Sequence, residues 1–271
     1  MHRDSSNASA AQGGDVGALL RHWRTARRIS QLDLSLEAEV SSRHLSFVET
    51  GKAQPSREMV LRLAEALEVP LRERNALLLA AGYAPVYRET GLEAPEMAAA
   101  RRAVEFILAQ QEPYPAVVLD RHWNLLMANA ATGRFLARFP ECAVPGRPNA
   151  MRLLFHPQGL RPFVEDWEGV AGIMIQRLHR EVAGAQSGAE TQELLEELLG
   201  YTGVPSRWQR PELDRPPAPL VAVSYRREGI RLSFFSTITT FGTPQDVTLQ
   251  ELRIESFFAA DEATRAALMA S

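Results

Sequence analysis

The sequence predicts an all-α domain of five short helices followed by an α+β domain. Apolar residues at helical spacing recur through residues 15–82, and a segment with two prolines and no strong periodicity follows them. Strand-like patterns then dominate the last third of the chain. At 271 residues the chain is long enough for two modest domains, each with its own core.

Helix-capping signals separate the five predicted helices. The first helix has one apolar stripe at i, i+3, i+4 and i+7, formed by Val16, Leu19, Leu20 and Trp23. Ser30 and Ser41 can cap a second and a third helix, and Gly51 ends the third. A fourth helix starts at Ser56, and a fifth ends at Gly82.

The domain boundaries follow from these patterns. We expect a disordered leader at 1–14, the helical domain at 15–82, a linker at 83–99 and the α+β domain at 100–271.

The second domain mixes strands and helices. Two short strands are expected within 116–128, with helices near 129–137, 161–184 and 189–200. Two strand-like runs flank "REG", which indicates a hairpin, and "VTLQELRIESFF" continues as a strand with one apolar and one polar face. A last helix is expected from about Asp261.

Composition restricts the function. No apolar run is long enough to predict a membrane span, and the leader has no apolar segment that would make it a signal peptide. A single cysteine, Cys142, cannot form an internal disulfide, so we expect a cytoplasmic protein. The net charge is −3, but residues 20–62 carry eight Arg/Lys against five Asp/Glu. The basic side of the chain is therefore its N-terminal part.

The second and third predicted helices, joined by a tight turn, have helix-turn-helix geometry. In this motif the N-terminal end of the second helix of the pair enters the major groove, so its early exposed side chains meet base edges. Arg43 can bond both acceptors of guanine, and Phe47 can contact a thymine methyl. The predicted DNA-contacting residues, including those placed for phosphates, are Gln31, Ser41, Ser42, Arg43, His44, Ser46, Phe47, Ser56 and Arg57. A helix-turn-helix kept only for dimerisation is the alternative.

The segment "LRHWRTARRISQLDLSLEAEVSSRHLSFVETGKAQPSREMVLRLAEAL" resembles the DNA-binding domain of the phage-repressor and Cro-like (XRE) family. The resemblance covers most of residues 15–82 and implies a structural ion pair between Arg24 and Glu49. Glu39 stands where the family usually has glycine, so we expect Glu39 to hold a positive φ at a cost on the order of 1 kcal/mol.

No arrangement of residues in the second domain points to an enzyme. The six histidines are scattered without metal-ligand spacing, and no nucleophile or phosphate-binding motif is present. We therefore expect no catalytic residues, no metal and no cofactor.

The strand "IRLSFFSTITTF" has a mixed face on which Phe235 and Thr237 lie among small hydroxyl residues. Such a face suits either an apolar pocket with a few orienting hydroxyls or an ordinary core under a helix. The candidates for a pocket wall are Trp123, Asn129, Phe135, Phe155, Trp167, Phe235 and Thr237.

The segments "DRHWNLLMAN" and "LLFHP…DW" resemble the MmyB-like ligand-binding domain, over most of residues 100–260. This resemblance implies a PAS-like half-barrel that encloses an apolar pocket for a fatty-acid-like molecule.

Together these observations predict a sequence-specific transcriptional regulator that senses a small apolar ligand, such as a fatty acid. We expect a homodimer on a pseudo-palindromic operator in double-stranded DNA, and no membrane association. The alternative is a DNA-binding regulator whose second domain is a protein-interaction or dimerisation module without a small-molecule ligand.

Overall fold

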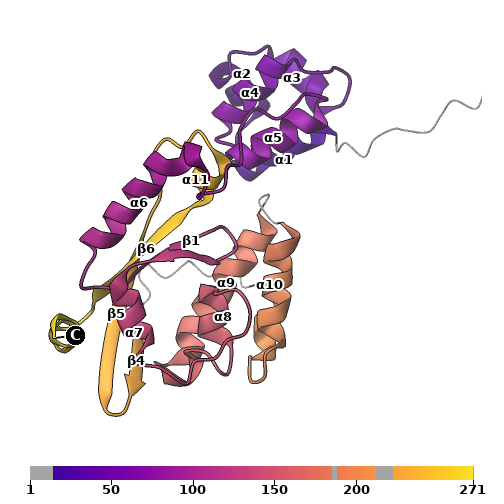
Figure 1. Cartoon of the computed structure of the whole chain (residues 1–271). Coiled ribbons are helices and arrows are strands. Elements are labelled where there is room, and N and C mark those ends of the chain that lie inside the picture. The colour runs from indigo at the N-terminus through magenta and orange to yellow at the C-terminus, as the bar shows by residue number, and fades with distance from the viewer. Residues whose placement is uncertain (1–14, 185–187, 212–221, 271) are drawn as a thin grey trace, which may run out of the picture. The chain divides into compact units, whose positions relative to one another are not determined.

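The computed structural model describes residues 15–184, 188–211 and 222–270. The predicted leader at 1–14 lies outside the described residues. The chain forms two compact units: the first runs to Arg88 and includes Gln245–Val247, and the second begins at Glu89 and takes the remainder (Figure 1). Within the first unit, the Val247 amide donates to the Arg88 carbonyl oxygen at 2.8 Å.

The first unit is helical, as the sequence predicted. Its helices are α1 (Val16–Ala26), α2 (Gln31–Glu37), α3 (Ser42–Glu49), α4 (Arg57–Ala66) and α5 (Leu71–Ala80). Side chains of Ser30, Ser41 and Ser56 accept a hydrogen bond from a backbone amide in the first turn of α2, α3 and α4. These caps satisfy amides that have no partner within the helix.

Each of these helices ends at a residue with positive φ: Arg28, Glu39, Gly51, Glu68 and Gly82. The left-handed residue turns the chain sharply and lets the next amide bond back into the last turn. After α2, for example, the Val40 amide donates to the Ser35 carbonyl oxygen at 2.9 Å. Glu39 holds a φ of 52°, which is the conformation expected from its place in the turn.

Helices α1 and α3 approach each other closely at Gly17. A Cβ atom on Gly17 would lie 2.1 Å from the Val48 carbonyl oxygen, so this contact needs glycine. Leu20, Leu34, Leu45 and Leu63 are fully buried in the same unit. The core therefore fixes α3 from behind and leaves its other face exposed.

The second unit is built on an antiparallel sheet with strand order β2-β1-β6-β5-β4-β3. The strands are β1 (Ala116–Leu119), β2 (Leu125–Ala128), β3 (Val164–Glu165), β4 (Ala222–Arg227), β5 (Ile230–Thr239) and β6 (Arg253–Ala259). The α+β class predicted for this domain is confirmed.

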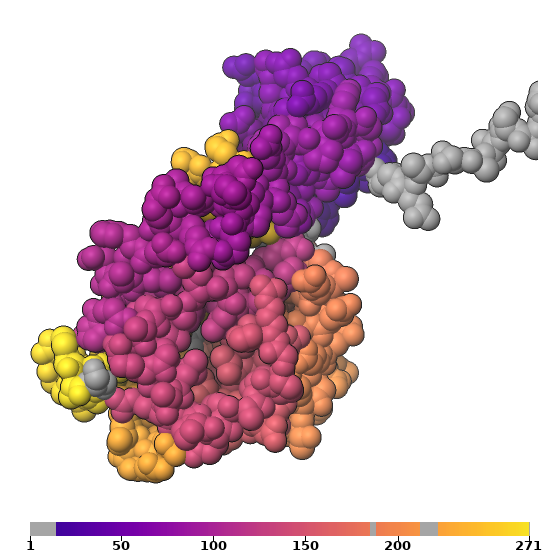
Figure 2. Space-filling view, in the orientation of Figure 1, coloured from indigo at the N-terminus to yellow at the C-terminus, as the bar shows by residue number. Residues whose placement is uncertain are grey.

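Helices surround this sheet. They are α6 (Ala98–Gln110), α7 (Ala130–Leu136), α8 (Ala150–Phe155), α9 (Trp167–Ala183), α10 (Ala189–Gly200), α11 (Val247–Glu251) and α12 (Glu262–Met269), with 3₁₀ turns at Pro95–Met97, Arg161–Phe163 and Ser206–Gln209. In the space-filling view the orange surface of α10 forms an outer layer of this unit (Figure 2).

Strand β1 is buried on both faces, which explains its continuous apolar run "AVVL". Ala116 and Val118 pack with α6 residues, whereas Val117 and Leu119 pack with residues of α8, α9 and α10. The sheet therefore lies between two helical layers, and the cavity described below lies on the α8 and α9 side.

Two predictions for this domain were wrong in detail. Residues 161–184 were expected to form one helix, but they contain a 3₁₀ turn, strand β3 and then α9. The run "VTLQELRIESFF" was expected to be one strand, but its first part forms α11 and β6 begins only at Arg253. Short segments such as these carry too few periods for helix and strand to be distinguished.

Candidate functional site

The exposed end of α3 carries the residues expected to contact DNA. Ser41, Ser42, Arg43 and His44 are exposed, Ser46 is partly buried, and Leu45 and Val48 face the core. Ser56 and Arg57, at the start of α4, are also exposed. The N-terminal turn of α3 is thus free to meet a duplex.

Arg43 and Phe47 form a pair on this surface. The Arg43 guanidinium lies 5.5 Å from the centre of the Phe47 ring, and Phe47 is 38% exposed. The two residues are one helical turn apart, so the ring supports the guanidinium by a cation–π contact. This contact restricts the directions in which Arg43 can extend from the helix.

Behind this surface, Arg24 of α1 and Glu49 of α3 form a buried ion pair. Arg24 Nε donates to Glu49 Oε1 at 2.7 Å, and Nη2 donates to Oε2 at 2.9 Å. Gln31 Nε2 also donates to Glu49 Oε2, at 2.8 Å. The Gln31 amide group, which we expected near a DNA phosphate, is therefore engaged inside the protein.

These donors control the ionisation of Glu49. Burial alone would raise its pKa, but the hydrogen bonds from Arg24 and Gln31 hold the pKa below its ordinary value. Glu49 is thus a charged group with both carboxylate oxygens satisfied.

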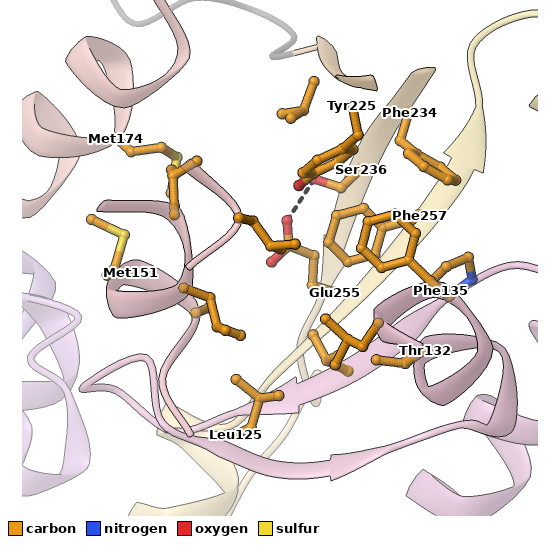
Figure 3. A pocket seen from close by; sticks show the side chains of 18 of the residues that line it. Leu125, Thr132, Phe135, Met151, Met174, Tyr225, Phe234, Ser236, Glu255 and Phe257 are labelled. Atoms are coloured by element: carbon orange, nitrogen blue, oxygen red, sulfur yellow. Dashed lines mark hydrogen bonds between the residues drawn. The ribbon is translucent and has the colours of Figure 1, made fainter. Parts of the chain in front are cut away.

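The second unit contains a cavity of about 160 Å³ between the sheet and helices α7, α8 and α9 (Figure 3). Its apolar wall comes from every layer that surrounds it. The strands and their flanks contribute Pro115, Val117, Leu125, Val223, Phe234, Phe235 and Phe257, and the helices with their connections contribute Phe135, Leu136, Ala150, Met151, Leu153, Leu154, Leu160, Val170 and Met174. A mainly apolar wall with few polar groups is typical of a small-molecule site.

The polar groups of the cavity are gathered mainly on the sheet. Among the described residues that line it, Glu255 is the only Asp, Glu, Lys, Arg or His, and Ser236 and Tyr225 lie beside it (Figure 3). Ser236 Oγ donates to Glu255 Oε1 at 2.6 Å. Burial raises the pKa of Glu255, against the opposing hydrogen bond from Ser236 and the charges of Arg177 and Arg253. Burial, and then the neighbouring Glu255, raise the pKa of the Tyr225 phenol.

Trp123 lines the cavity and is held from several sides. It is 1% exposed, and its Nε1 donates to Glu181 Oε2 at 2.9 Å. The guanidinium carbons of Arg177 and Arg253 lie 4.6 and 5.1 Å from the centre of a Trp123 ring. Both arginines also pair with Glu181, at 3.3 and 3.1 Å. These two cations therefore help to hold the wall, and Nη1 of Arg253 is buried with no hydrogen-bond partner in the described part of the chain.

The structure brings three of the seven predicted pocket residues, Trp123, Phe135 and Phe235, to the cavity. Asn129 instead caps α7 and binds the backbone of Ala116 and Tyr114. Phe155 and Trp167 belong to the core cluster beside α9, with their ring centroids 5.9 Å apart. Thr237 is exposed.

The sequence pattern indicated the face of β5 that carries Phe235 and Thr237, but the cavity lies mainly against the opposite face, which carries Phe234 and Ser236. Phe234 and Ser236 share one face of β5 and line the cavity (Figure 3), whereas Phe235 alternates to the other face, where its ring stacks on Phe258 of β6 with centroids 5.3 Å apart. The pattern alone could not show which face the helices would cover.

Sequence reasoning missed Glu255, Tyr225 and Ser236. The sequence predicts one apolar and one polar face for the run "VTLQELRIESFF", and the alternation puts Glu255 on the polar face with Arg253. A usable signal was present, because Phe257 follows at i+2 and must share that face. A large aromatic residue beside a carboxylate on one strand face indicates that the carboxylate is partly buried.

Two family profiles match the chain. The helix-turn-helix domain matches residues 15–77, and the MmyB-like transcription regulator ligand binding domain matches residues 100–270. A DNA-binding helix-turn-helix unit followed by a ligand-binding domain defines a transcription regulator. The chain belongs to the MmyB-like transcription regulators, and both resemblances drawn from the sequence are confirmed.

Solved structures show weaker likenesses. The restriction-modification controller protein C.AhdI from Aeromonas hydrophila is 33% identical over 22% of this chain and 91% of its own, with a TM-score of 0.22. The clp gene regulator ClgR from Corynebacterium glutamicum is 22% identical over 39% of this chain and 99% of its own, with a TM-score of 0.24. No curated protein matches the chain.

The described residues contain no group of three or more His, Cys, Asp or Glu side chains that could hold a metal ion. None of the helices in the described part of the chain is long and apolar enough to cross a membrane.

Proposed function

We propose that this regulator reads a specific DNA sequence with α3 and that its second domain senses a small apolar, fatty-acid-like ligand. The observation that carries the proposal is the cavity, whose wall is almost entirely apolar and which lies inside a domain of the ligand-binding family. The antiparallel sheet with helices packed across it supports a PAS-like architecture for this domain.

The size of the cavity favours a small guest. Its volume of about 160 Å³ is close to that of engineered apolar cavities of about 150 Å³, which stay dry and bind benzene. Met151 and Met174 in the wall are unbranched and can change rotamer, so a longer alkyl chain can be accommodated by repacking. We therefore propose a compact apolar molecule or a flexible alkyl chain as the ligand.

DNA recognition rests on few side chains, and this favours a dimer. Arg43 and Phe47 reach outward from one short helix, which can read only a few base pairs. Two copies on a pseudo-palindromic operator, with α3 helices about 34 Å apart, would double the number of bases that are read. We accordingly propose a homodimer that acts on double-stranded DNA in the cytoplasm and is not an enzyme.

Selection of binding sites from a random DNA pool, followed by two matched substitutions, tests the DNA proposal. Arg43→Ala should weaken binding to the selected sequence by about 1–3 kcal/mol and leave nonspecific binding almost unchanged. Arg57→Ala should weaken binding to all sequences alike and reduce the salt dependence. Equal losses on every DNA for Arg43→Ala would contradict base reading by α3.

Native mass spectrometry of the purified protein tests the ligand proposal. We expect an added mass that is removed by organic extraction and that corresponds to an apolar compound. If no apolar compound is found bound, and none binds when added, the second domain would instead act as a protein-interaction or dimerisation module.

A further inference from the structure

The polar end of the cavity has an acceptor without a donor. Glu255 Oε1 accepts from Ser236, but in the described part of the chain Oε2 has no hydrogen-bond partner. Tyr225 lines the same part of the cavity, and its hydroxyl makes no hydrogen bond to any described residue. Figure 3 shows Tyr225, Ser236 and Glu255 gathered on one side of the cavity. Both residues are partly buried, so a ligand in the cavity can supply the partner that the described residues do not.

The same geometry is unfavourable for an anionic head group. None of the described residues that line the cavity is Lys, Arg or His. The nearest cations, Arg177 and Arg253, lie against Trp123 and pair with Glu181. Arg177 and Arg253 already face two carboxyl groups, Glu181 and Glu255, so a ligand carboxylate would place a third acidic group against the same two cations.

From this arrangement we propose that the cavity selects an apolar ligand with an uncharged hydroxyl group, which donates to Glu255 and accepts from Tyr225. A hydroxyl group is both a donor and an acceptor, so it can satisfy both protein groups at once. An ammonium group could only donate and would leave the Tyr225 hydroxyl without an acceptor. This inference rests on the proposed ligand-sensing function and replaces the acid group of a fatty-acid-like ligand by a hydroxyl group, so that the expected ligand resembles a fatty alcohol.

Calorimetric titration with two matched series of probes tests the proposal on the full-length protein. The first series consists of straight-chain primary alcohols from 1-hexanol to 1-dodecanol, and the second of the carboxylates of the same chain lengths at neutral pH. A range of lengths ensures that chain size does not decide the outcome. At its best length the alcohol should bind at least about tenfold more tightly than the matched carboxylate, because only the carboxylate must be buried next to a like charge.

Two variants assign the preference to Glu255. Glu255→Gln has almost the same shape and offers an amide donor, so the preference for the alcohol should fall to about threefold or less, or reverse. Thr237→Ala is the matched control, since Thr237 lies on the same strand but is exposed. It should keep the preference of the unmodified protein. Thermal unfolding of each variant confirms that it is folded.

The outcomes separate this inference from the function on which it rests. If the carboxylates bind as tightly as the alcohols, or if Glu255→Gln leaves the preference unchanged, the cavity is a ligand site but the assignment of its polar end is wrong. If neither series binds at any length and native mass spectrometry shows no apolar guest, both the ligand-sensing function and this inference are overturned.

Discussion

The two units each bury a glutamate, and the two carboxylates are treated in opposite ways. Glu49 accepts hydrogen bonds from Arg24 and Gln31 on both oxygens, and its pKa is lowered despite burial. Glu255 accepts one hydrogen bond, from Ser236, and burial raises its pKa. Both oxygens of the first carboxylate are hydrogen-bonded within the protein, and this carboxylate links α1 to α3. The second carboxylate has one oxygen without a hydrogen-bond partner in the described part of the chain, as is expected of a group that binds a ligand.

Removing Arg24, the partner of Glu49, should have the largest effect on stability. Arg24→Ala leaves the Glu49 charge buried without its cation, so we expect the first unit to lose about 3–5 kcal/mol of stability. Urea unfolding followed by circular dichroism measures this loss. Arg43→Ala is the matched control, because Arg43 is exposed, and it should leave the unfolding midpoint unchanged. An unchanged midpoint for Arg24→Ala would show that the ion pair does not hold the unit together.

The same substitution at both carboxylates should change stability in opposite directions. Glu49→Gln removes the charge that binds Arg24, and it should destabilise the first unit by about 1.5–3 kcal/mol. Glu255→Gln removes a charge that the cavity disfavours. It should stabilise the second unit by on the order of 1 kcal/mol, or about 2–4 °C in Tm. Differential scanning calorimetry of the two variants checks the signs, and equal signs would remove the contrast between the sites.

The pH dependence of unfolding should separate the two sites. Because the pKa of Glu49 is held below its ordinary value of 4.5, the stability it contributes is present above that value. This contribution is lost as the pH falls through the lowered pKa. The raised pKa of Glu255 acts in the opposite sense, so stability of the second unit falls as the pH rises from 4.5 through the raised pKa. Urea unfolding across this range checks both variants. Glu49→Gln should lose the pH dependence that comes from Glu49 and keep the one that comes from Glu255, and Glu255→Gln should do the reverse.

An exposed glutamate provides the smallest effect and a test of burial as the cause. Glu39 lies 3.7 Å from Arg62 with 83% of its side chain exposed, so Glu39→Gln should change stability by less than about 0.5 kcal/mol. Glu39→Gly should instead stabilise the first unit by about 1 kcal/mol, since glycine adopts the φ of 52° without strain. If Glu39→Gln changed stability as much as the substitutions at Glu49 and Glu255, burial of the carboxyl group would not be the cause of those effects.

The two regions also differ in how far the sequence could predict them. In the first unit, capping serines and the periodic apolar residues are local signals, and they predicted the five helices and the exposed end of α3. The Gln31 contact with Glu49 joins residues 18 positions apart and could not be predicted from local signals.

In the second unit, the strands and the family resemblance were predictable but the inside of the cavity was not. Glu255 and Ser236 meet only because β5 and β6 pair in one register, and alternation alone does not show which face becomes buried. Asn129 shows the converse. The sequence suggested it as a pocket residue, but its side-chain oxygen accepts hydrogen bonds from backbone amides of β1 and α7.

A ¹³C NMR titration of the glutamate side-chain carboxyls tests the contrast between Glu49 and Glu255 most directly. We predict one signal that titrates below the ordinary range and disappears in Glu49→Gln, and another that titrates above it and disappears in Glu255→Gln. Addition of the tightest-binding alcohol should lower the second pKa, because a hydrogen bond donated to the carboxylate favours its charged form. Two signals that both titrate near 4.5, with or without the alcohol, would contradict the account.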